Sequence, residues 1–321
     1  MSDDGNDNAE LPTGFGITSG KRAAAEKDED ARGPRPPTHH LTSHMTNQRK
    51  YPYAARRLAA ELTPIPHLQR APYSGPTEPR RIVTDDGVSL AATLWRHGAS
   101  RLVIICHGFA ASQRTASIVW LAEHLAGPYD VLTFDWRGYG QSEGLATFGG
   151  AEARDLAAVL TAARAWGYQR VVVVAESMGG LITLASLGAA SDTAEFPFPD
   201  AVATVSAPAA YELTGGLRPH LVRHVAPVSW LRPVAPLLGF RLGEVQPPTP
   251  LEVVERISLP LLVIHGDRDT TVPVRNAYLL NERNPAISLR VYPGVDHAIV
   301  GMRARSPRLL LADLRALIEE R

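Results

Sequence analysis

The sequence has little cysteine, no excess of charge of either sign and no long hydrophobic run. Its one cysteine, Cys106, excludes an intramolecular disulfide and a cysteine metal cluster, and it fits a reducing cytoplasm. Lysine and arginine total 33, as do aspartate and glutamate, so the formal net charge of zero gives no electrostatic case for binding nucleic acid or an anionic membrane. No stretch resembles a secretory signal or a transmembrane helix. We therefore expect a cytoplasmic protein.

The chain does have enough apolar material for one large core, because its 321 residues are 45% hydrophobic and 21% charged. Residues 1–50 are the exception. They hold few large apolar side chains and no periodic pattern, so we predict a disordered tail. The histidines at 39, 40 and 44 lack carboxylate or cysteine support, which favours a solvated segment over a metal site. All lysines of the chain fall within this tail, which favours Met45 as the native start.

Residues 51–80 are rich in proline and arginine, and we expect them to wrap the domain as an N-terminal extension with one short helix at 51–62. The main domain is predicted at 81–321. It begins with a β-hairpin, since an Asp-Asp-Gly turn at 85–87 separates two alternating apolar segments.

From residue 101 onward, short apolar runs alternate with helical patterns. Such alternation predicts parallel strands joined by right-handed crossover helices, which is an α/β fold with a mostly parallel central sheet flanked by helices. The expected strands are 102–106, 131–134, 171–175, 201–206, 261–265 and 289–292, and the expected helices are 118–126, 151–166, 181–189 and 308–319.

One segment interrupts this alternation. Residues 209–256 are rich in proline and in large apolar side chains, so they are too long for a simple connection and too apolar for a linker. We predict a small helical cap inserted over the site. Its substrate-binding candidates are Trp230, Leu231 and Phe240, and its arginines (Arg218, Arg223, Arg232 and Arg241) are expected to meet a substrate carboxylate or to face solvent.

The sequence around Ser177 predicts a nucleophile. Four valines at 171–174 indicate a buried strand, and helical spacing resumes after Met178. A strand, a sharp turn and a helix form the context in which a strained serine projects above a sheet. The positions two residues away must be small, and they are Ala175 and Gly179. The usual pattern has glycine at both, so Ala175 is a departure that we expect to fit.

Candidate partners for this serine follow the later strands. Asp267 and Asp269 come after the strand at 261–265, and Asp296 and His297 come after the last strand. A serine needs an imidazole to take its proton, and the imidazole needs a carboxylate to orient it. Asp296 adjoins His297 and is awkwardly placed to pair with it. Asp269 and Asp267 therefore stay open as candidate acids at this point.

These motifs resemble those of the α/β-hydrolase superfamily over residues 80–321, and the turn at Ser177 is similar to that of serine esterases and monoacylglycerol-lipase-like members. The motifs are His107-Gly108-Phe109, the turn from Phe134 to Ser142, Glu176-Ser177-Met178-Gly179-Gly180 and the segment from His265 to Pro273.

The resemblance implies a catalytic triad of Ser177, Asp269 and His297 in that chain order, and an oxyanion hole made by the backbone N–H groups of Phe109 and Met178. It implies that His107 organises its loop and that the turn at 135–140 is structural. Ser142 and Ser206 lack the context of a nucleophile.

The expected function is a serine hydrolase that cleaves a small-molecule acyl or aromatic ester through an acyl-enzyme, without metal or organic cofactor. The same triad serves acyltransferases, thioesterases and cofactor-free perhydrolases, because a fold does not fix a reaction. A non-catalytic ligand receptor is the alternative from another class. The physiological substrate, its chain length and the oligomeric state do not follow from the sequence.

Overall fold

The computed structural model describes residues 70–193, 195–210, 213–214, 240–243 and 249–320. The predicted tail at 1–50, the helix at 51–62 and most of the cap therefore lie outside the described residues, as do Trp230 and Leu231. Within them, no helix is long and apolar enough to cross a membrane.

The described chain is built on an eight-stranded sheet in the order β1-β2-β4-β3-β5-β6-β7-β8. β1 and β2 form an antiparallel hairpin, β2 pairs antiparallel with β4, and every later pairing is parallel. This confirms the mostly parallel sheet. The strands are β1 Glu78–Val83, β2 Ser89–Trp95, β3 Arg101–Cys106, β4 Asp130–Phe134, β5 Arg170–Glu176, β6 Ala201–Val205, β7 Leu261–Gly266 and β8 Ser288–Tyr292.

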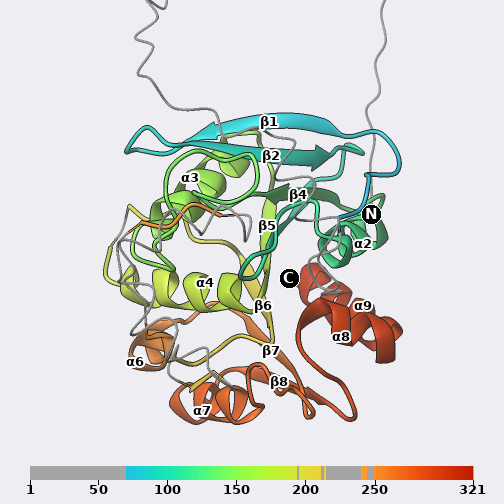
Figure 1. Ribbon diagram of the computed structural model, residues 1–321, viewed down its shortest axis with the longest axis vertical. Helices are drawn as coiled ribbons and strands as arrows, with labels where there is room; N and C mark the ends of the chain where they lie inside the picture. The colour runs from blue at the N-terminus through green and yellow to red at the C-terminus, as the bar shows by residue number, and fades with distance from the viewer. Residues whose placement is uncertain (1–69, 194, 211–212, 215–239, 244–248, 321) are drawn as a thin grey trace, which may run out of the picture. The chain divides into compact units, whose positions relative to one another are not determined.

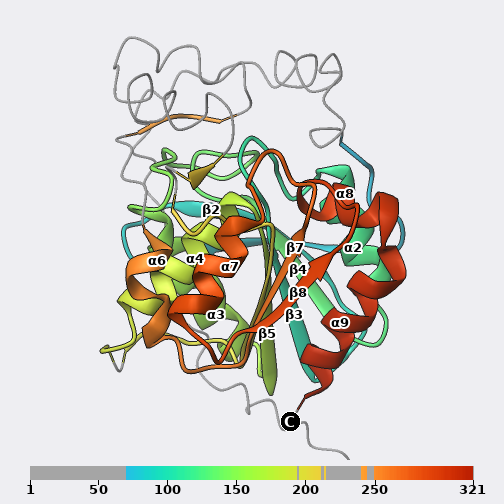
Figure 2. The same ribbon diagram turned by 90° about the horizontal axis from the view of Figure 1, so that it is seen from below.

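Helices cover both faces of this sheet (Figures 1 and 2). On one face lie α3 Glu152–Ala165, α4 Met178–Ala189, α6 Pro250–Val253 with the short 3-10 helix η6 Val254–Arg256, and α7 Arg275–Arg283. On the other lie α2 Ala116–Leu125, α8 Ala298–Arg305 and α9 Pro307–Glu319.

The four valines of β5 show how the sequence specifies this layering. All are fully buried, but Val171 and Val173 pack on the α3 and α4 side, whereas Val172 and Val174 pack on the α2 and α9 side. A strand apolar on both faces must be an inner strand with helices above and below it. β5 accordingly lies between β3 and β6.

The order of the strands determines where on the sheet a ligand-binding crevice can form. The chain crosses from β3 to β4 on one side, and the next strand, β5, returns to the other side of β3. Such a reversal opens a crevice at the carboxyl ends of the strands, where ligands of α/β sheets bind. The loop after β3 and the turn after β5 meet at this point.

The structure adds three short helices that the periodicity did not predict. They are α7, α8 and α6, the last of which forms at the end of the predicted cap segment. α6 is packed on α4 so closely that a β-carbon on Gly188 would lie 2.5 Å from the carbonyl oxygen of Val253. Residues 250–256 thus belong to the helical layer beside the sheet.

Candidate active site

Ser177 lies in a strained turn between β5 and α4. Its φ is +50° and its ψ is −117°, a region that non-glycine residues rarely occupy. The turn passes close to the loop after β3, because a β-carbon on Gly179 would lie 2.6 Å from the carbonyl oxygen of His107. Gly179 is therefore required, as expected. Ala175 is accommodated as a fully buried residue within β5.

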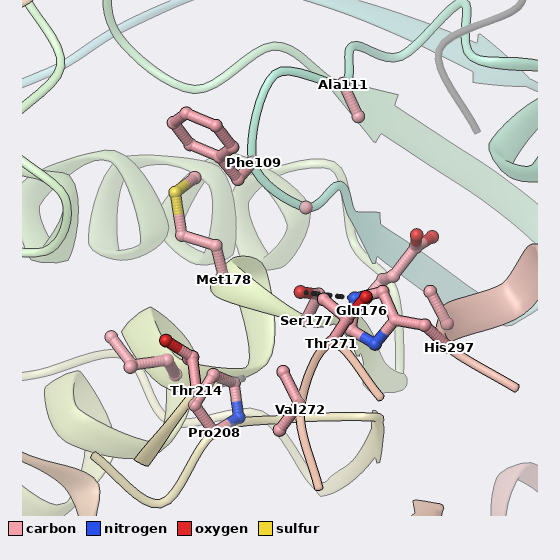
Figure 3. Close-up of a pocket in the computed structure, with 13 residues that line it drawn as sticks. Phe109, Ala111, Glu176, Ser177, Met178, Pro208, Thr214, Thr271, Val272 and His297 are labelled. Carbon is pink, nitrogen blue, oxygen red and sulfur yellow. Dashed lines mark hydrogen bonds between the residues drawn. The ribbon is translucent and has the colours of Figure 1, made fainter. Parts of the chain in front are cut away.

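The turn brings Ser177 to His297, and His297 to Asp269. His297 Nε2 is 3.0 Å from Ser177 Oγ, and His297 Nδ1 is 2.7 Å from Asp269 Oδ2 (Figure 3 shows the first contact). These residues come from the end of β5, the loop after β7 and the loop after β8. The sequence-predicted side chains thus form one continuous hydrogen-bonded row.

The two rival carboxylates have other partners. Asp267 Oδ1 accepts a hydrogen bond from the backbone N–H of Gly294 at 2.6 Å. Asp296 Oδ1 accepts one from the backbone N–H of His297 at 2.8 Å, so it does not orient the ring. Of these three aspartates, Asp269 is the one bonded to the imidazole.

Asp269 is held as a carboxylate by donors on several sides. Its Oδ1 accepts the backbone N–H groups of Thr271 and Val272 at 3.0 and 2.8 Å. Burial raises the pKa of Asp269, but hydrogen bonds from His265 and His297 and the backbone outweigh burial and hold that pKa well below its usual range. The carboxylate is therefore charged at any working pH.

The sequence reasoning missed His265 as a contact of the acid. This fully buried histidine is the penultimate residue of β7. Its Nε2 donates to the carbonyl of Val272 at 2.8 Å and lies 3.4 Å from Asp269 Oδ2. Its spacing four residues before Asp269 was the available signal.

Ser206 was also missed. It is buried at the end of β6 with a φ of +56°, and its Oγ accepts the backbone N–H of Ala298 at 2.9 Å. Because Ala298 follows His297 directly, this bond fixes the loop that carries the imidazole.

His107 has the organising role that the resemblance implied. Its Nδ1 donates to the carbonyl of Gly108 at 2.8 Å, and its Nε2 accepts the backbone N–H of Trp136 at 3.2 Å. Burial lowers the pKa of His107, which agrees with a neutral ring that donates on one side and accepts on the other.

The turn after β4 is structural, as predicted. The carboxylate of Asp135 accepts the backbone N–H groups of Gln113 and Gln141, both at 2.8 Å. Arg137 pairs with Asp86 and Asp155, each at 2.8 Å. Ser142 accepts the backbone N–H of Ala91 at 2.8 Å and serves no chemistry.

Beside this hydrogen-bonded row is a pocket with a mostly apolar lining. Phe109, Met178, Leu181, Pro208, Val272 and Ala298 line it together with Ser177 and His297. Phe109 stays 38% exposed at its mouth and meets Phe240 with ring centroids 5.2 Å apart. Phe240, predicted to bind substrate, thus supports the wall of the pocket from behind Phe109.

Arg241 anchors the segment that carries Phe240. Its guanidinium donates to the backbone carbonyls of Ser142 and Gly144, the latter at 3.0 Å. Its backbone N–H donates to the carbonyl of Gly138 at 2.8 Å. Arg241 therefore holds the chain to the turn after β4 and was wrongly expected to meet a substrate carboxylate or solvent. Arg218, Arg223 and Arg232 lie outside the described residues.

One polar group in the pocket was given no role by the sequence reasoning. Glu176 directly precedes Ser177, and its side chain lines the pocket. Burial raises its pKa to about 8.

Residues 103–312 match the family model described as the alpha/beta hydrolase family. A stretch of 198 residues is 32% identical to the uncharacterized protein YqkD of Bacillus subtilis, and the match covers 58% of this chain and 61% of that protein's length.

Two solved structures share the fold. An esterase of Pyrococcus furiosus superposes with a TM-score of 0.61 at 24% identity, over 78% of this chain and 97% of its own. An esterase of Rhodococcus sp. ECU1013 superposes with a TM-score of 0.57 at 22% identity, over 75% of this chain and 98% of its own. With the family match, these likenesses confirm the predicted α/β-hydrolase fold.

Proposed function

Since this chain belongs to the alpha/beta hydrolase family, we propose that it is a serine hydrolase that cleaves a carboxylic ester through an acyl-enzyme intermediate. The observation that carries the proposal is the row from Asp269 through His297 to Ser177, with contacts of 2.7 and 3.0 Å. A receptor that only binds a ligand would not need this row, so its presence favours catalysis over binding.

In the first half of the reaction, Ser177 Oγ attacks the ester carbonyl while His297 Nε2 takes the hydroxyl proton. Asp269 keeps the other ring nitrogen protonated and stabilises the imidazolium. The charge that develops on the carbonyl oxygen needs backbone donors. Met178 occupies the first position of α4, where the N–H has no partner within the helix and the helix dipole is positive. We assign the second donor to the N–H of Phe109.

In the second half, His297 passes its proton to the leaving alcohol, and the acyl group stays on Ser177. Water then enters, loses a proton to His297 and attacks the acyl-enzyme, which releases the acid and restores the serine. The balance is one ester and one water converted to one alcohol and one acid.

The choice of an ester rests on the pocket and on the fold neighbours. The lining carries apolar walls suited to an acyl or aromatic group. The structures from Pyrococcus furiosus and Rhodococcus are described as esterases. We also propose that the part of the 209–256 segment before α6 caps the site, because two of its described residues are placed at the pocket: Thr214 lines it, and Phe240 packs on Phe109. A cytoplasmic location stays a prediction from the sequence.

The test is a panel of p-nitrophenyl esters of increasing acyl length, run with covalent labelling by a fluorophosphonate. We expect ester turnover, with labelling that maps to Ser177. Thioester substrates, added alcohol acceptors and hydrogen peroxide in the same assay separate a thioesterase, an acyltransferase and a perhydrolase from a hydrolase. A protein that binds the esters but neither turns them over nor becomes labelled would contradict the proposal.

A further inference from the structure

Glu176 is a buried carboxyl in the active-site pocket that the mechanism above does not use. Its side chain is only 5% exposed, and within the described part of the chain its Oε2 is buried without a hydrogen-bond partner. Burying a polar group without a partner costs free energy, and such groups are rare in proteins. A buried carboxyl without a partner beside a nucleophile therefore indicates that a bound ligand supplies its hydrogen-bond partner.

The packing shows where this carboxyl lies. Glu176 is the last residue of β5, and its side chain packs against the loop after β3. A β-carbon on Gly108 of that loop would lie 3.8 Å from Glu176 Cγ and 3.2 Å from Ser177 Cβ. In Figure 3 its carboxyl lies on the His297 side of Ser177, whereas Phe109 and Met178 lie on the opposite side. The pocket thus has an apolar side and a side with one carboxyl.

The mechanism assigns these two sides to the two halves of an ester. His297 must deliver a proton to the departing alcohol oxygen, so the alcohol part lies on the imidazole side of Ser177. The acyl part then extends along the apolar side. From this placement, and resting on the proposed ester hydrolysis, we propose that Glu176 forms a leaving-group subsite that hydrogen-bonds a hydroxyl of the alcohol part.

The chemistry of the Glu176 carboxyl group favours a hydroxyl as its hydrogen-bond partner. Burial raises the pKa of Glu176 to about 8, so at neutral pH the side chain is an acid with one O–H donor and one carbonyl acceptor. A hydroxyl can both accept from it and donate to it. Among the residues that line the pocket, His297 is the other ionisable group, and it is committed to Ser177 and Asp269. An apolar alcohol would leave the carboxyl unpaired.

The experiment compares two esters of one acid, 2-hydroxyethyl butyrate and propyl butyrate, whose alcohol parts have the same number of heavy atoms. The readout is the ratio of their kcat/KM values in wild type, Glu176→Leu and Glu176→Gln. We expect wild type to prefer the hydroxyethyl ester. In Glu176→Leu this ratio should fall by roughly 3- to 10-fold, which corresponds to the loss of one neutral hydrogen bond. Glu176→Gln keeps most of the preference, since an amide also donates and accepts.

The pH dependence separates a subsite from a structural role. Any effect of pH that the two esters share cancels in the ratio. As the pH rises through about 8, Glu176 ionises and loses its donor, so the wild-type ratio should change while the Glu176→Gln ratio stays flat. This comparison holds even where Glu176→Leu does not fold.

Four results would overturn the subsite. An unchanged ratio in Glu176→Leu, or an equal loss for both esters, would leave Glu176 a packing residue. A larger gain for the 2-(trimethylammonio)ethyl ester than for the hydroxyethyl ester would make the site a cation site. If wild type cleaves no ester and escapes the fluorophosphonate, the proposed function fails and the subsite fails with it; ester turnover without the hydroxyl preference refutes the subsite alone.

Discussion

Ser177 carries backbone strain that its proposed role as the nucleophile explains. A serine at a φ of +50° persists because β5, α4 and the loop after β3 hold it there, and the turn directs Oγ toward His297. Of the site residues, the hydrogen-bonded row of Ser177, His297 and Asp269 could be predicted from the sequence because chain order and motif spacing constrain it. The roles of Glu176 and His265 could not be assigned from the sequence. They depend on the burial of each side chain and on whether it has a hydrogen-bond partner in the folded protein, and a sequence motif shows neither.

We expect Ser177→Ala to abolish labelling and to lower ester turnover by a factor on the order of 10⁴ or more, because the substitution removes the oxygen that contacts His297 Nε2. The unfolding midpoint should stay near that of wild type, since only one oxygen atom is removed. The control is Ser191→Ala, whose Oγ bonds the carbonyl of Gly188 at the end of α4. Turnover retained by Ser177→Ala would refute the serine mechanism.

Asp269→Asn should lower kcat/KM by a factor on the order of 10⁴, because an amide facing Nδ1 favours the wrong tautomer of His297. Asp267→Asn is the matched control. It keeps an oxygen that accepts the N–H of Gly294, so we expect a change below about 10-fold. Steady-state kinetics on one p-nitrophenyl ester ranks the two variants, and the opposite ranking would transfer the acid role to Asp267.

At the scale of elements, the sequence predicted the strands and long helices well because their apolar patterns are strong. α7 and α8 escaped prediction for a physical reason. α7 buries only Asn276, Ala277 and Leu280 in its nine residues, and α8 has eight residues and begins directly after His297. Such short helices form because the folded domain covers them, and eight or nine residues contain too few turns for a helical pattern to be recognised in advance.

Arg241 joins two parts of the chain, and we expect its contacts to contribute to stability. Arg241→Ala removes donors to the carbonyls of Ser142 and Gly144 and should lower the free energy of unfolding by about 1–3 kcal/mol. Arg154→Ala also removes one positive charge, but its pair with Asp85 is exposed at 52% and 69%, so a change below about 0.5 kcal/mol is expected. Urea titrations give both values. Equal losses would mean that the segment at 240–243 is not held by Arg241.

For the whole molecule, the order of strands joins residues that are distant in the chain. The reversal at β3 brings the loop after β3 beside the turn after β5, and β6, β7 and β8 then follow on the same side. Ser177 and His297 are 120 positions apart and still within 3.0 Å. Alternating patterns predict that strands are parallel, but they do not specify this order, which the resemblance to a known fold supplied.

Glu176 also links the stability of the whole fold to pH. Burial raises its pKa from 4.5 to about 8, so between these values the folded protein holds a proton that the unfolded chain has released. The unfolded state binds fewer protons, and stability must fall as the pH rises across this window. The contribution of one such group approaches about 1.4 kcal/mol per pH unit.

Glu176→Gln should remove this dependence, because glutamine does not titrate. We therefore expect urea titrations at pH 5, 6, 7 and 8 to show that the free energy of unfolding of the variant rises relative to that of wild type as the pH rises. This relative rise should stop above pH 8, where Glu176 ionises in the folded wild-type protein as well. Glu282→Gln, on the exposed surface of α7, makes the same chemical change and should run parallel to wild type. If Glu176→Gln also runs parallel to wild type, then Glu176 is ionised in the folded protein, and water or a bound ion must reach the carboxyl beside the nucleophile.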